Sequence, residues 1–292
     1  NNLALMGVSP VQLRTMIEKK INSLSIWLFE NLLRYEGIGQ FISTRIGGHS
    51  SPPYDSLNLS FNVGDDPDKV LKNRKLLAGT LGIPLTNLTT ARQIHDGHVR
   101  IVSDALRGKG STNYKGAINA TDAMVTNAPN ICLMILLADC VPILFCDPSK
   151  RVIGVAHAGW KGTLRFVAHN TVKVLREHFG CSPQDIVVGI GPSIGPCCYQ
   201  VRQEVLSQVE HVLGTRQDCI RHESANGKGY FDLWTANLKQ LLQAGIPEKN
   251  IEMAETCTSH HPNLFFSHRH EKGKTGRFGA GIVITPQPAQ GH

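Results

Sequence analysis

The chain has 292 residues, of which 41% are hydrophobic, and it carries a formal net charge of +7. A chain of this length and composition encloses a substantial hydrophobic core, which excludes an intrinsically disordered protein. Its basic residues are spread between acidic ones, without the arginine-rich runs of a nucleic-acid binder, so no nucleic-acid partner is expected. The excess positive charge favours small anionic ligands.

The sequence predicts a soluble, cytoplasmic protein. Its longest apolar run, 131–138, is far shorter than the about 20 residues that a membrane-spanning helix needs. The first 21 residues lack the basic region and apolar stretch of a secretory signal. The eight cysteines are scattered, and Cys132 and Cys146 lie within apolar strand-like runs, as reduced thiols of a cytoplasmic protein do.

Three regions are expected along the chain. Residues 1–36 are predicted to form an N-terminal extension with an amphipathic helix, because apolar side chains recur at helical spacing over 11–21. Residues 37–285 are predicted to form one catalytic domain, since no repeat or linker divides them. Residues 286–292 form a polar, Pro-rich tail that is predicted to be disordered.

Predicted strands and helices alternate within residues 37–285. The strands are expected over 38–46, 131–137, 141–146, 151–156, 186–190 and 281–285, and the helices over 68–81, 163–179, 200–213 and 233–243. Asp66 and Pro67 open the first helix, and Gly180 ends the second. This order predicts an α/β (α+β mixed) fold with mixed β-sheets in a single domain.

Three segments combine a potential metal ligand with a strand end or a turn: Gln93-Ile94-His95, Ala138-Asp139-Cys140 and His157-Ala158-Gly159-Trp160. A lone cysteine after an apolar strand is usually a small hydrophobic residue. Cys140 and His157, however, end adjacent strand-like runs and could project from one rim. Two imidazoles and a thiolate leave one open position on a tetrahedral zinc ion, as in catalytic zinc sites.

Glycine-rich segments at 44–50, 157–162 and 189–198 predict a shaped pocket near this cluster. Glycines allow close backbone approach, and successive amides can form an anion-binding concavity. The segments match neither the phosphate-binding loop nor the dinucleotide fingerprint, so neither ATP nor NAD is expected.

An ordered series of motifs over residues 38–285 resembles the YfiH-like family. The motifs are FISTRIGGHSSPPYDSLNLSFNVGDDPDKVLKNR, RQIH, TDAMVT, LADCVPILF, HAGWKGT, GPSIGPCCYQV, FDL and CTSHHPNLFFSHRHEKGKTGR. Members of this family were long labelled multicopper polyphenol oxidases or laccase-domain proteins and are now regarded as purine nucleoside phosphorylases.

The resemblance implies a four-layer α/β/β/α fold and a zinc ion held by His95, Cys140 and His157. It also implies phosphorolysis of adenosine, inosine, guanosine and methylthioadenosine, together with deamination of adenosine. The chain departs from the family pattern at Lys161, where Arg is common, and at His268 and His270, where Tyr and a second Arg are frequent. Lysine cannot replace the bidentate fork of arginine, which puts a phosphate-binding role at Lys161 in doubt.

The favoured hypothesis is an enzyme that binds a purine nucleoside over the zinc ion. Orthophosphate is expected to be held by Arg45 and neighbouring loop amides, because a guanidinium pairs with phosphate oxygens in bidentate fashion. Arg269 and Arg277 are the next candidates for this role. Asp122 and Asp139 are candidates for orienting groups or proton carriers, and a solvated or strand-capping role is an open alternative for each. The oligomeric state and the preferred nucleoside do not follow from the sequence.

Three alternatives remain open at this stage. One is a metal-free cysteine hydrolase or amidase, with Cys140 as nucleophile, His157 as base and a peptidoglycan precursor among its conceivable targets. Another is a non-catalytic protein with a structural zinc ion and a partner protein. The third is a copper-dependent polyphenol oxidase, which needs several His-x-His pairs, whereas this chain has one, His268-Arg269-His270. Copper at Cys140 is therefore expected only as an adventitious ion.

Overall fold

The computed structural model describes residues 16–214, 218–224 and 227–285. A six-stranded sheet, which we call sheet 1, has the strand order β1-β2-β3-β15-β7-β4. The bounds of its strands are β1 Ile17–Ile21, β2 Leu24–Leu28, β3 Ile38–Ser43, β4 Leu88–Thr90, β7 Cys132–Leu137 and β15 Phe278–Ile284. Neighbouring strands are antiparallel except β4, which is parallel to β7, so the sheet is mixed.

A second six-stranded sheet, sheet 2, has the order β14-β10-β8-β9-β6-β5. Its strands are β5 Val99–Ile101, β6 Ala123–Thr126, β8 Val141–Asp147, β9 Val152–Ala158, β10 Val187–Ile190 and β14 Ile251–Met253. This sheet is also mixed, because β10–β14 and β5–β6 are parallel and the other pairs are antiparallel. A small antiparallel sheet joins β11 Gln200–Arg202, β13 Lys228–Phe231 and β12 Ile220–Ser224.

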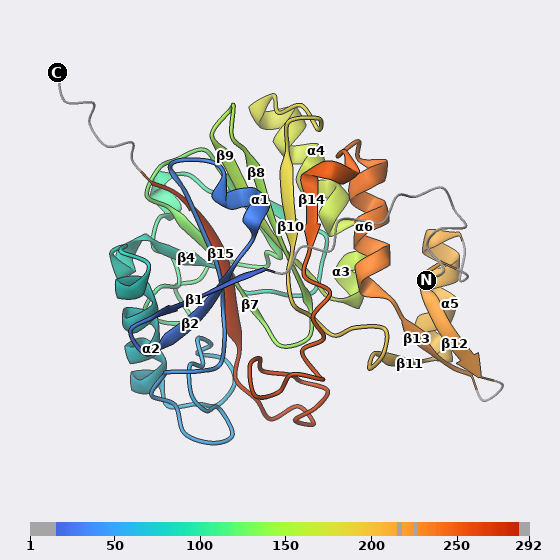
Figure 1. Ribbon diagram of the computed structural model, residues 1–292, viewed down its shortest axis with the longest axis horizontal. Helices are drawn as coiled ribbons and strands as arrows, with labels where there is room; N and C mark the ends of the chain where they lie inside the picture. Colours follow the sequence, from blue (N-terminus) through green and yellow to red (C-terminus); the bar gives the residue numbers. More distant parts are fainter. Residues whose placement is uncertain (1–15, 215–217, 225–226, 286–292) are drawn as a thin grey trace.

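The described residues contain six α-helices. Their bounds are α1 Glu30–Leu33, α2 Pro67–Thr80, α3 Trp160–Leu164, α4 Val167–Phe179, α5 Gln203–Leu213 and α6 Leu233–Gln243. Short 3-10 helices occupy Leu85–Asn87, Asp104–Leu106 and Glu248–Asn250. In Figure 1, α2 lies on one side of the sheets and α4 with α6 on the other. The predicted four-layer α/β/β/α arrangement in a single domain is confirmed.

The strand sequences explain why both faces of each large sheet are covered. Along β7, Leu133, Ile135 and Leu137 join the core between the two sheets, whereas Cys132 and Met134 join the core under α2. Successive side chains of a strand point to opposite faces, so a continuous apolar run of this kind requires a packing layer on each side.

The predicted N-terminal helix over 11–21 is wrong in its described part, because Ile17–Ile21 is strand β1. This strand pairs antiparallel with β2 through a two-residue turn in which Asn22 has a φ of 54°. Asparagine tolerates this left-handed conformation, which allows the tight turn of a β-hairpin. The segment therefore forms a strand although its apolar residues have helical spacing. Residues 11–15 and the predicted tail 286–292 lie outside the described residues.

Two other predicted helices differ in detail. The helix expected over 163–179 is divided into α3 and α4, because Phe166 has a φ of 59° and interrupts the helical hydrogen-bond ladder. The helix expected over 200–213 begins only at Gln203, since 200–202 form β11 and pair with β13. The division after α3 matters for the site, because α3 follows directly on the segment that contains His157.

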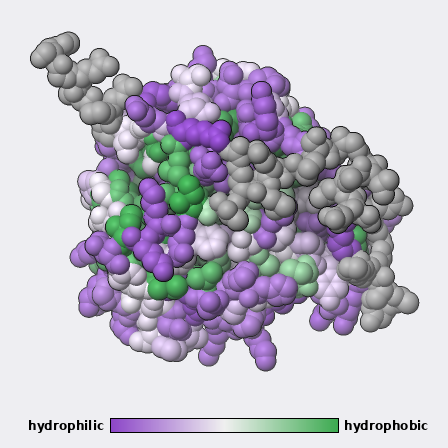
Figure 2. Space-filling view, viewed as in Figure 1, coloured by the Kyte–Doolittle hydropathy of each residue, from purple (hydrophilic) through white to green (hydrophobic). Residues whose placement is uncertain are grey.

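Hydrophilic residues predominate on the face shown in Figure 2, and hydrophobic residues gather there only in small areas. Most large apolar side chains lie instead in three buried clusters, which pack between the two large sheets and between the sheets and their helices. Among the described residues, no helix combines the length and the apolar character that crossing a membrane requires.

Candidate active site

The strand pairing of sheet 2 places Cys140 and His157 at the same edge. Cys140 directly precedes β8, and His157 is the penultimate residue of β9. Because β8 and β9 are antiparallel, with Pro142 opposite His157, the start of one strand lies beside the end of the other. This is the rim arrangement that the sequence predicts for the pair.

His95 reaches this edge on the loop that follows β4. The side chain of Gln93 fixes the loop to sheet 1 by two hydrogen bonds of 2.9 Å, one donated to the carbonyl of Leu136 and one accepted from its amide. His95 itself has a φ of 60°, a left-handed conformation that is uncommon outside glycine. Such a conformation persists when surrounding contacts hold it, which here include the link through Gln93.

The side chains of His95, Cys140 and His157 form one cluster, in which the potential ligand atoms all lie within 4.8 Å of one another. The two imidazole rings meet edge to face, with centroids 4.8 Å apart. His157 is buried, Cys140 is half-buried and His95 is exposed, so the cluster opens to solvent on one side. The three side chains together could hold a metal ion.

Asp122 lies behind the cluster and is almost fully buried. His157 Nδ1 lies 2.8 Å from Asp122 Oδ1, which leaves Nε2 of His157 for a metal ion. The same carboxylate accepts the backbone amides of residues 94, 95 and 96 at 3.1, 2.9 and 2.8 Å. A carboxylate on the far nitrogen of a metal-binding histidine fixes its tautomer and orientation, so Asp122 is a positioning residue.

The electrostatics of the cluster favour a thiolate. Burial raises the pKa of the Cys140 thiol, but the charge and hydrogen bonding of His157 and His95 outweigh burial and lower that pKa to about 6. Burial lowers the pKa of His157, but the Cys140 thiolate and Asp122 raise it to about 9. The pKa of Asp122 lies below its ordinary value, because hydrogen bonding and charge from His157 oppose the effect of burial. A thiolate is the form of cysteine that binds a metal ion.

Asp139 lines the cavity and connects segments of its wall by hydrogen bonds. Its carboxylate accepts hydrogen bonds from the hydroxyls of Thr258 and Ser267, both at 2.7 Å, and from the amide of Arg269 at 2.6 Å. Asp139 has a φ of 85° and is buried. Of the roles considered for Asp139, which are orientation, proton transfer and a solvated or strand-capping position, these contacts favour orientation.

A cavity of about 510 Å³ opens over the cluster, which is within the range of small-molecule sites. His268, Arg269 and Arg277 supply basic groups to its wall. Its other lining residues include the aromatic and aliphatic side chains of Tyr114, Leu136, Trp160, Ile194, Tyr199 and Leu233. The sequence singled out neither Tyr114 nor Tyr199, because no spacing pattern connects them with the metal-ligand motifs.

The two cavity arginines are held differently. Arg277 donates to the carbonyls of Thr275 and Gly276 at 2.9 and 2.8 Å. Burial lowers its pKa, although the nearby Cys140, Asp139 and Glu271 act in the opposite direction. Arg269 donates to the carbonyl of Cys198 at 3.0 Å, and its guanidinium lies over the ring of Tyr199.

The structure does not bring Arg45 to this cavity. Its guanidinium donates to the carbonyls of Asp55 and Pro262 and to the carboxylate of Glu271, at 2.8, 2.7 and 3.0 Å. It also lies over the ring of Phe266 and lines a separate, smaller depression. A guanidinium committed to these partners has few free donors, so its position does not support the predicted contact with phosphate.

The structure also shows where the three residues that depart from the family pattern, Lys161, His268 and His270, lie relative to the cavity. Lys161 is exposed, lies over the ring of Trp160 and does not line the cavity. His268 lines the cavity, whereas His270 does not.

Comparisons with known proteins show which family the chain belongs to. The family model described as multi-copper polyphenol oxidoreductase laccase matches residues 39–285. Purine nucleoside phosphorylase YlmD of Geobacillus stearothermophilus is 38% identical over 251 residues, which are 86% of this chain and 92% of YlmD. Adenosine deaminase RL5, from an unknown prokaryotic organism, is 33% identical over 247 residues, which are 85% of this chain and 94% of RL5.

Among solved structures, the hypothetical protein YfiH of Bacillus licheniformis has the same fold, with a TM-score of 0.86 at 35% identity. The match covers 92% of this chain and 99% of that one.

Proposed function

The chain belongs to the family described as multi-copper polyphenol oxidoreductase laccase, and from this premise we propose that it is a zinc-dependent purine nucleoside phosphorylase. Its relatives are named purine nucleoside phosphorylase and, in one case, adenosine deaminase, so we include deamination of adenosine as a second reaction of the same site. The proposal rests on one observation above all, the opening of the His95–Cys140–His157 cluster into a cavity that also holds two arginines.

His95, Cys140 and His157 would hold the zinc ion, and Asp122 would hold both histidines in place. Bound there, the ion supplies Lewis acidity, which stabilises negative charge that develops during the reaction. The lowered pKa of Cys140 supports this role, because the thiolate is present at neutral pH without the ion.

The cavity divides into surfaces suited to the two substrates. The aromatic rings and aliphatic side chains of its wall suit a purine base, which stacks on flat apolar surfaces. We assign orthophosphate to Arg277, with Arg269 as a second candidate, since these residues line the cavity and Arg45 does not. A guanidinium can pair with two phosphate oxygens at once.

In the proposed phosphorolysis, a phosphate oxygen forms a bond to C1′ of the ribose while the bond from C1′ to the base nitrogen breaks. The electron pair of that bond leaves with the purine, which takes up a proton. The sugar leaves as ribose 1-phosphate, or as 5-methylthioribose 1-phosphate when the substrate is methylthioadenosine. The chain contributes by holding the two substrates in line and by excluding bulk water. Adenosine, inosine, guanosine and methylthioadenosine are the proposed substrates.

A reducing compartment suits the proposed protein. All eight cysteines lie in the described residues and are free, and the Cys140 thiolate needs a reduced state to bind zinc. We therefore place the reaction in the cytoplasm.

Product identification tests the proposal. Metal-replete protein is incubated with adenosine, with and without orthophosphate, and the products are separated by chromatography. Adenine and ribose 1-phosphate that form only with phosphate support phosphorolysis, and inosine with ammonia supports deamination. The absence of both product pairs would overturn the proposal.

A cysteine hydrolase is the second candidate, because Cys140, His157 and Asp122 form a thiolate–imidazole–carboxylate series with a thiol pKa of about 6. This geometry is also that of a nucleophile with its base and orienting group. The two candidates differ in their dependence on metal. The test is product formation from adenosine by a His95→Ala variant that contains no metal. Product formation that survives in this variant would favour the hydrolase, and product formation that is lost together with the metal would favour the phosphorylase.

A further inference from the structure

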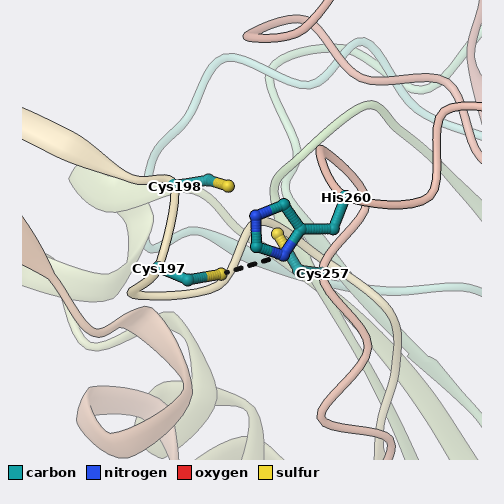
Figure 3. Close-up of side chains that lie close together, drawn as sticks. All are labelled: Cys197, Cys198, Cys257 and His260. Atoms are coloured by element: carbon teal, nitrogen blue, oxygen red, sulfur yellow. Dashed lines mark hydrogen bonds between the residues drawn. The ribbon is translucent and has the colours of Figure 1, made fainter.

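Three cysteines and a histidine outside the cavity cluster also lie together. The potential ligand atoms of Cys197, Cys198, Cys257 and His260 are all within 4.8 Å of one another. Figure 3 shows the side chains converging from two loops, with the sulfur atoms of the cysteines gathered around the ring of His260. Cys197 and Cys198 lie between β10 and β11, whereas Cys257 and His260 follow β14. The mechanism proposed above uses none of these four side chains.

Distances within this second cluster suit a tetrahedral metal ion. Cys197 Sγ lies 3.6 Å from His260 Nδ1. Tetrahedral zinc with sulfur at about 2.3 Å and nitrogen at about 2.05 Å separates these two ligand types by about 3.6 Å. A ring nitrogen and a thiol at this distance are therefore already placed as two ligands of one ion.

The backbone holds the two loops in register before any ion binds. Residues Ser193 and Cys257 form a parallel bridge, in which Ser193 donates to the carbonyl of Thr256 at 3.1 Å and Thr258 donates to the carbonyl of Ser193 at 3.0 Å. The amide of Gly195 donates to Cys257 Sγ at 3.3 Å. An amide donated to a sulfur atom stabilises a thiolate and orients it, as hydrogen bonds around metal ligands do.

The chemistry of the four groups favours coordination over isolated thiols. Three thiol groups and one imidazole within 4.8 Å of one another match the Cys3His ligand set of structural zinc sites. A disulfide between two of the cysteines would leave the third thiol and His260 without a role.

We propose that Cys197, Cys198, Cys257 and His260 bind a second zinc ion in a closed Cys3His site that joins the loop before β11 to the loop after β14. Four protein ligands leave no open position, which is the pattern of structural zinc sites. Cys197 and His260 are exposed, so the ion has a route from solvent.

This second zinc ion would stabilise one wall of the cavity. Ile194 and Tyr199 belong to the first of the two loops and line the cavity. The guanidinium of Arg269 donates to the carbonyl of Cys198 and lies over the ring of Tyr199. Loss of the second ion should therefore loosen the part of the wall that carries Tyr199 and Arg269.

Metal analysis of the full-length protein tests the inference directly. Protein purified with zinc under reducing conditions should contain about two zinc ions per chain, one in each site. His260→Asn and Cys197→Ser should each lower this content to about one, and Cys140→Ala should remove the other ion. His261→Asn is the matched control, because His261 is the exposed neighbour of His260 and lies outside the cluster. Its zinc content should equal that of the unaltered chain.

Cobalt replacement provides a second measurement that does not depend on the stability of the cluster variants. In a Cys140→Ala, His157→Ala background, bound Co²⁺ should still show an intense thiolate-to-cobalt absorption band, which the further change His260→Asn weakens. About one zinc ion per chain that is lost in Cys140→Ala and kept in His260→Asn would overturn the inference. One ion that is kept in Cys140→Ala and lost in His260→Asn would support it and count against zinc at the first site. A disulfide among the three cysteines after purification under reducing conditions would also overturn the inference. So would copper(I) bound at this cluster in place of zinc.

Discussion

Asp122 Oδ1 lies 2.8 Å from His157 Nδ1 and also accepts the backbone amide of His95 at 2.9 Å. A single carboxylate oxygen thus connects two of the three proposed zinc ligands. The other oxygen, Oδ2, accepts the amides of Ile94 and Asp96. Both oxygens act only as acceptors, which requires the ionised carboxylate and explains why an aspartate occupies this buried position.

Asp122→Asn should weaken zinc binding by roughly 10–100-fold, the range typical of changes to the partners of metal ligands. The amide of asparagine would turn a donor toward backbone amides that need an acceptor, so the loop with His95 should move. Competition for zinc against a chelating dye measures the affinity.

Asp96→Asn serves as the control for this substitution. The carboxylate of Asp96 accepts the amide of Gly97 and pairs with Arg165, and it contacts none of the proposed ligands. Zinc affinity in this variant should stay at the level of the unaltered protein. An Asp122→Asn protein that folds and keeps full zinc affinity would show that Asp122 does not position the histidines.

Arg277→Ala should raise the KM for orthophosphate by roughly 10–150-fold, the effect of losing about 1.5–3 kcal/mol of charged hydrogen bonding. Arg277→Lys should recover part of this loss, because lysine keeps the charge without the bidentate fork. Initial rates at saturating nucleoside and varied phosphate provide the measurement.

Arg45→Ala tests whether phosphate binds in the cavity or at Arg45, the residue that the sequence favours. Arg45 links Asp55, Pro262 and Glu271, so its loss should lower the free energy of unfolding by roughly 1–3 kcal/mol. The KM for phosphate should not change. If the KM rises in Arg45→Ala and not in Arg277→Ala, phosphate binds where the sequence places it and our assignment to the cavity is wrong.

The sequence predicted those parts of the fold and site that depend on local patterns. Buried strands such as β7 and β8 have apolar runs bounded by turns, and Cys140 and His157 follow from the ends of two neighbouring strands. Strand β1 was missed because its apolar residues also fit a helix, and only pairing with β2 decides between the two. A short segment with ambiguous spacing takes its structure from its tertiary partners.

The sequence did not predict the direction of long side chains or the meeting of loops that are far apart in the chain. The motif that contains Arg45 indicates a loop after a strand, but the direction of the guanidinium depends on Glu271, more than 200 residues later. The cluster of Cys197, Cys198, Cys257 and His260 depends in the same way on the bridge between Ser193 and Cys257. Without that bridge, the eight cysteines read as unrelated reduced thiols.

Added copper should not give stoichiometric four-electron reduction of oxygen, although the family description names multi-copper oxidoreductases. Among the described residues, the cavity cluster contains two histidines, His95 and His157, and the second candidate metal cluster contains only one, His260. A trinuclear copper centre needs more imidazole ligands than either cluster offers. Oxygen uptake with a phenolic substrate and an absorption scan for an intense thiolate-to-copper band test this point. Fast turnover with several copper ions bound per chain would refute our assignment of zinc.

Gly159→Ala should impair the zinc site through steric contact alone. Gly159 has a φ of −71°, which any residue adopts, but an added Cβ would lie 2.9 Å from both Cys140 Sγ and His95 Cδ2. Overpacking of this kind costs roughly 1–3 kcal/mol, which corresponds to roughly 5–150-fold in zinc affinity.

Zinc competition and thermal unfolding of the metal-free protein separate the local effect of Gly159→Ala from a general one. Gly79→Ala is the control, because Gly79 lies in α2 and an added Cβ there meets nothing within 4 Å. That variant should bind zinc normally and gain slightly in stability, since alanine favours the helix. The displaced His95 lies on an exposed loop, so Gly159→Ala should lose zinc affinity before it loses the fold. Normal zinc affinity in Gly159→Ala would mean that the ligands approach the ion from other positions than those seen here.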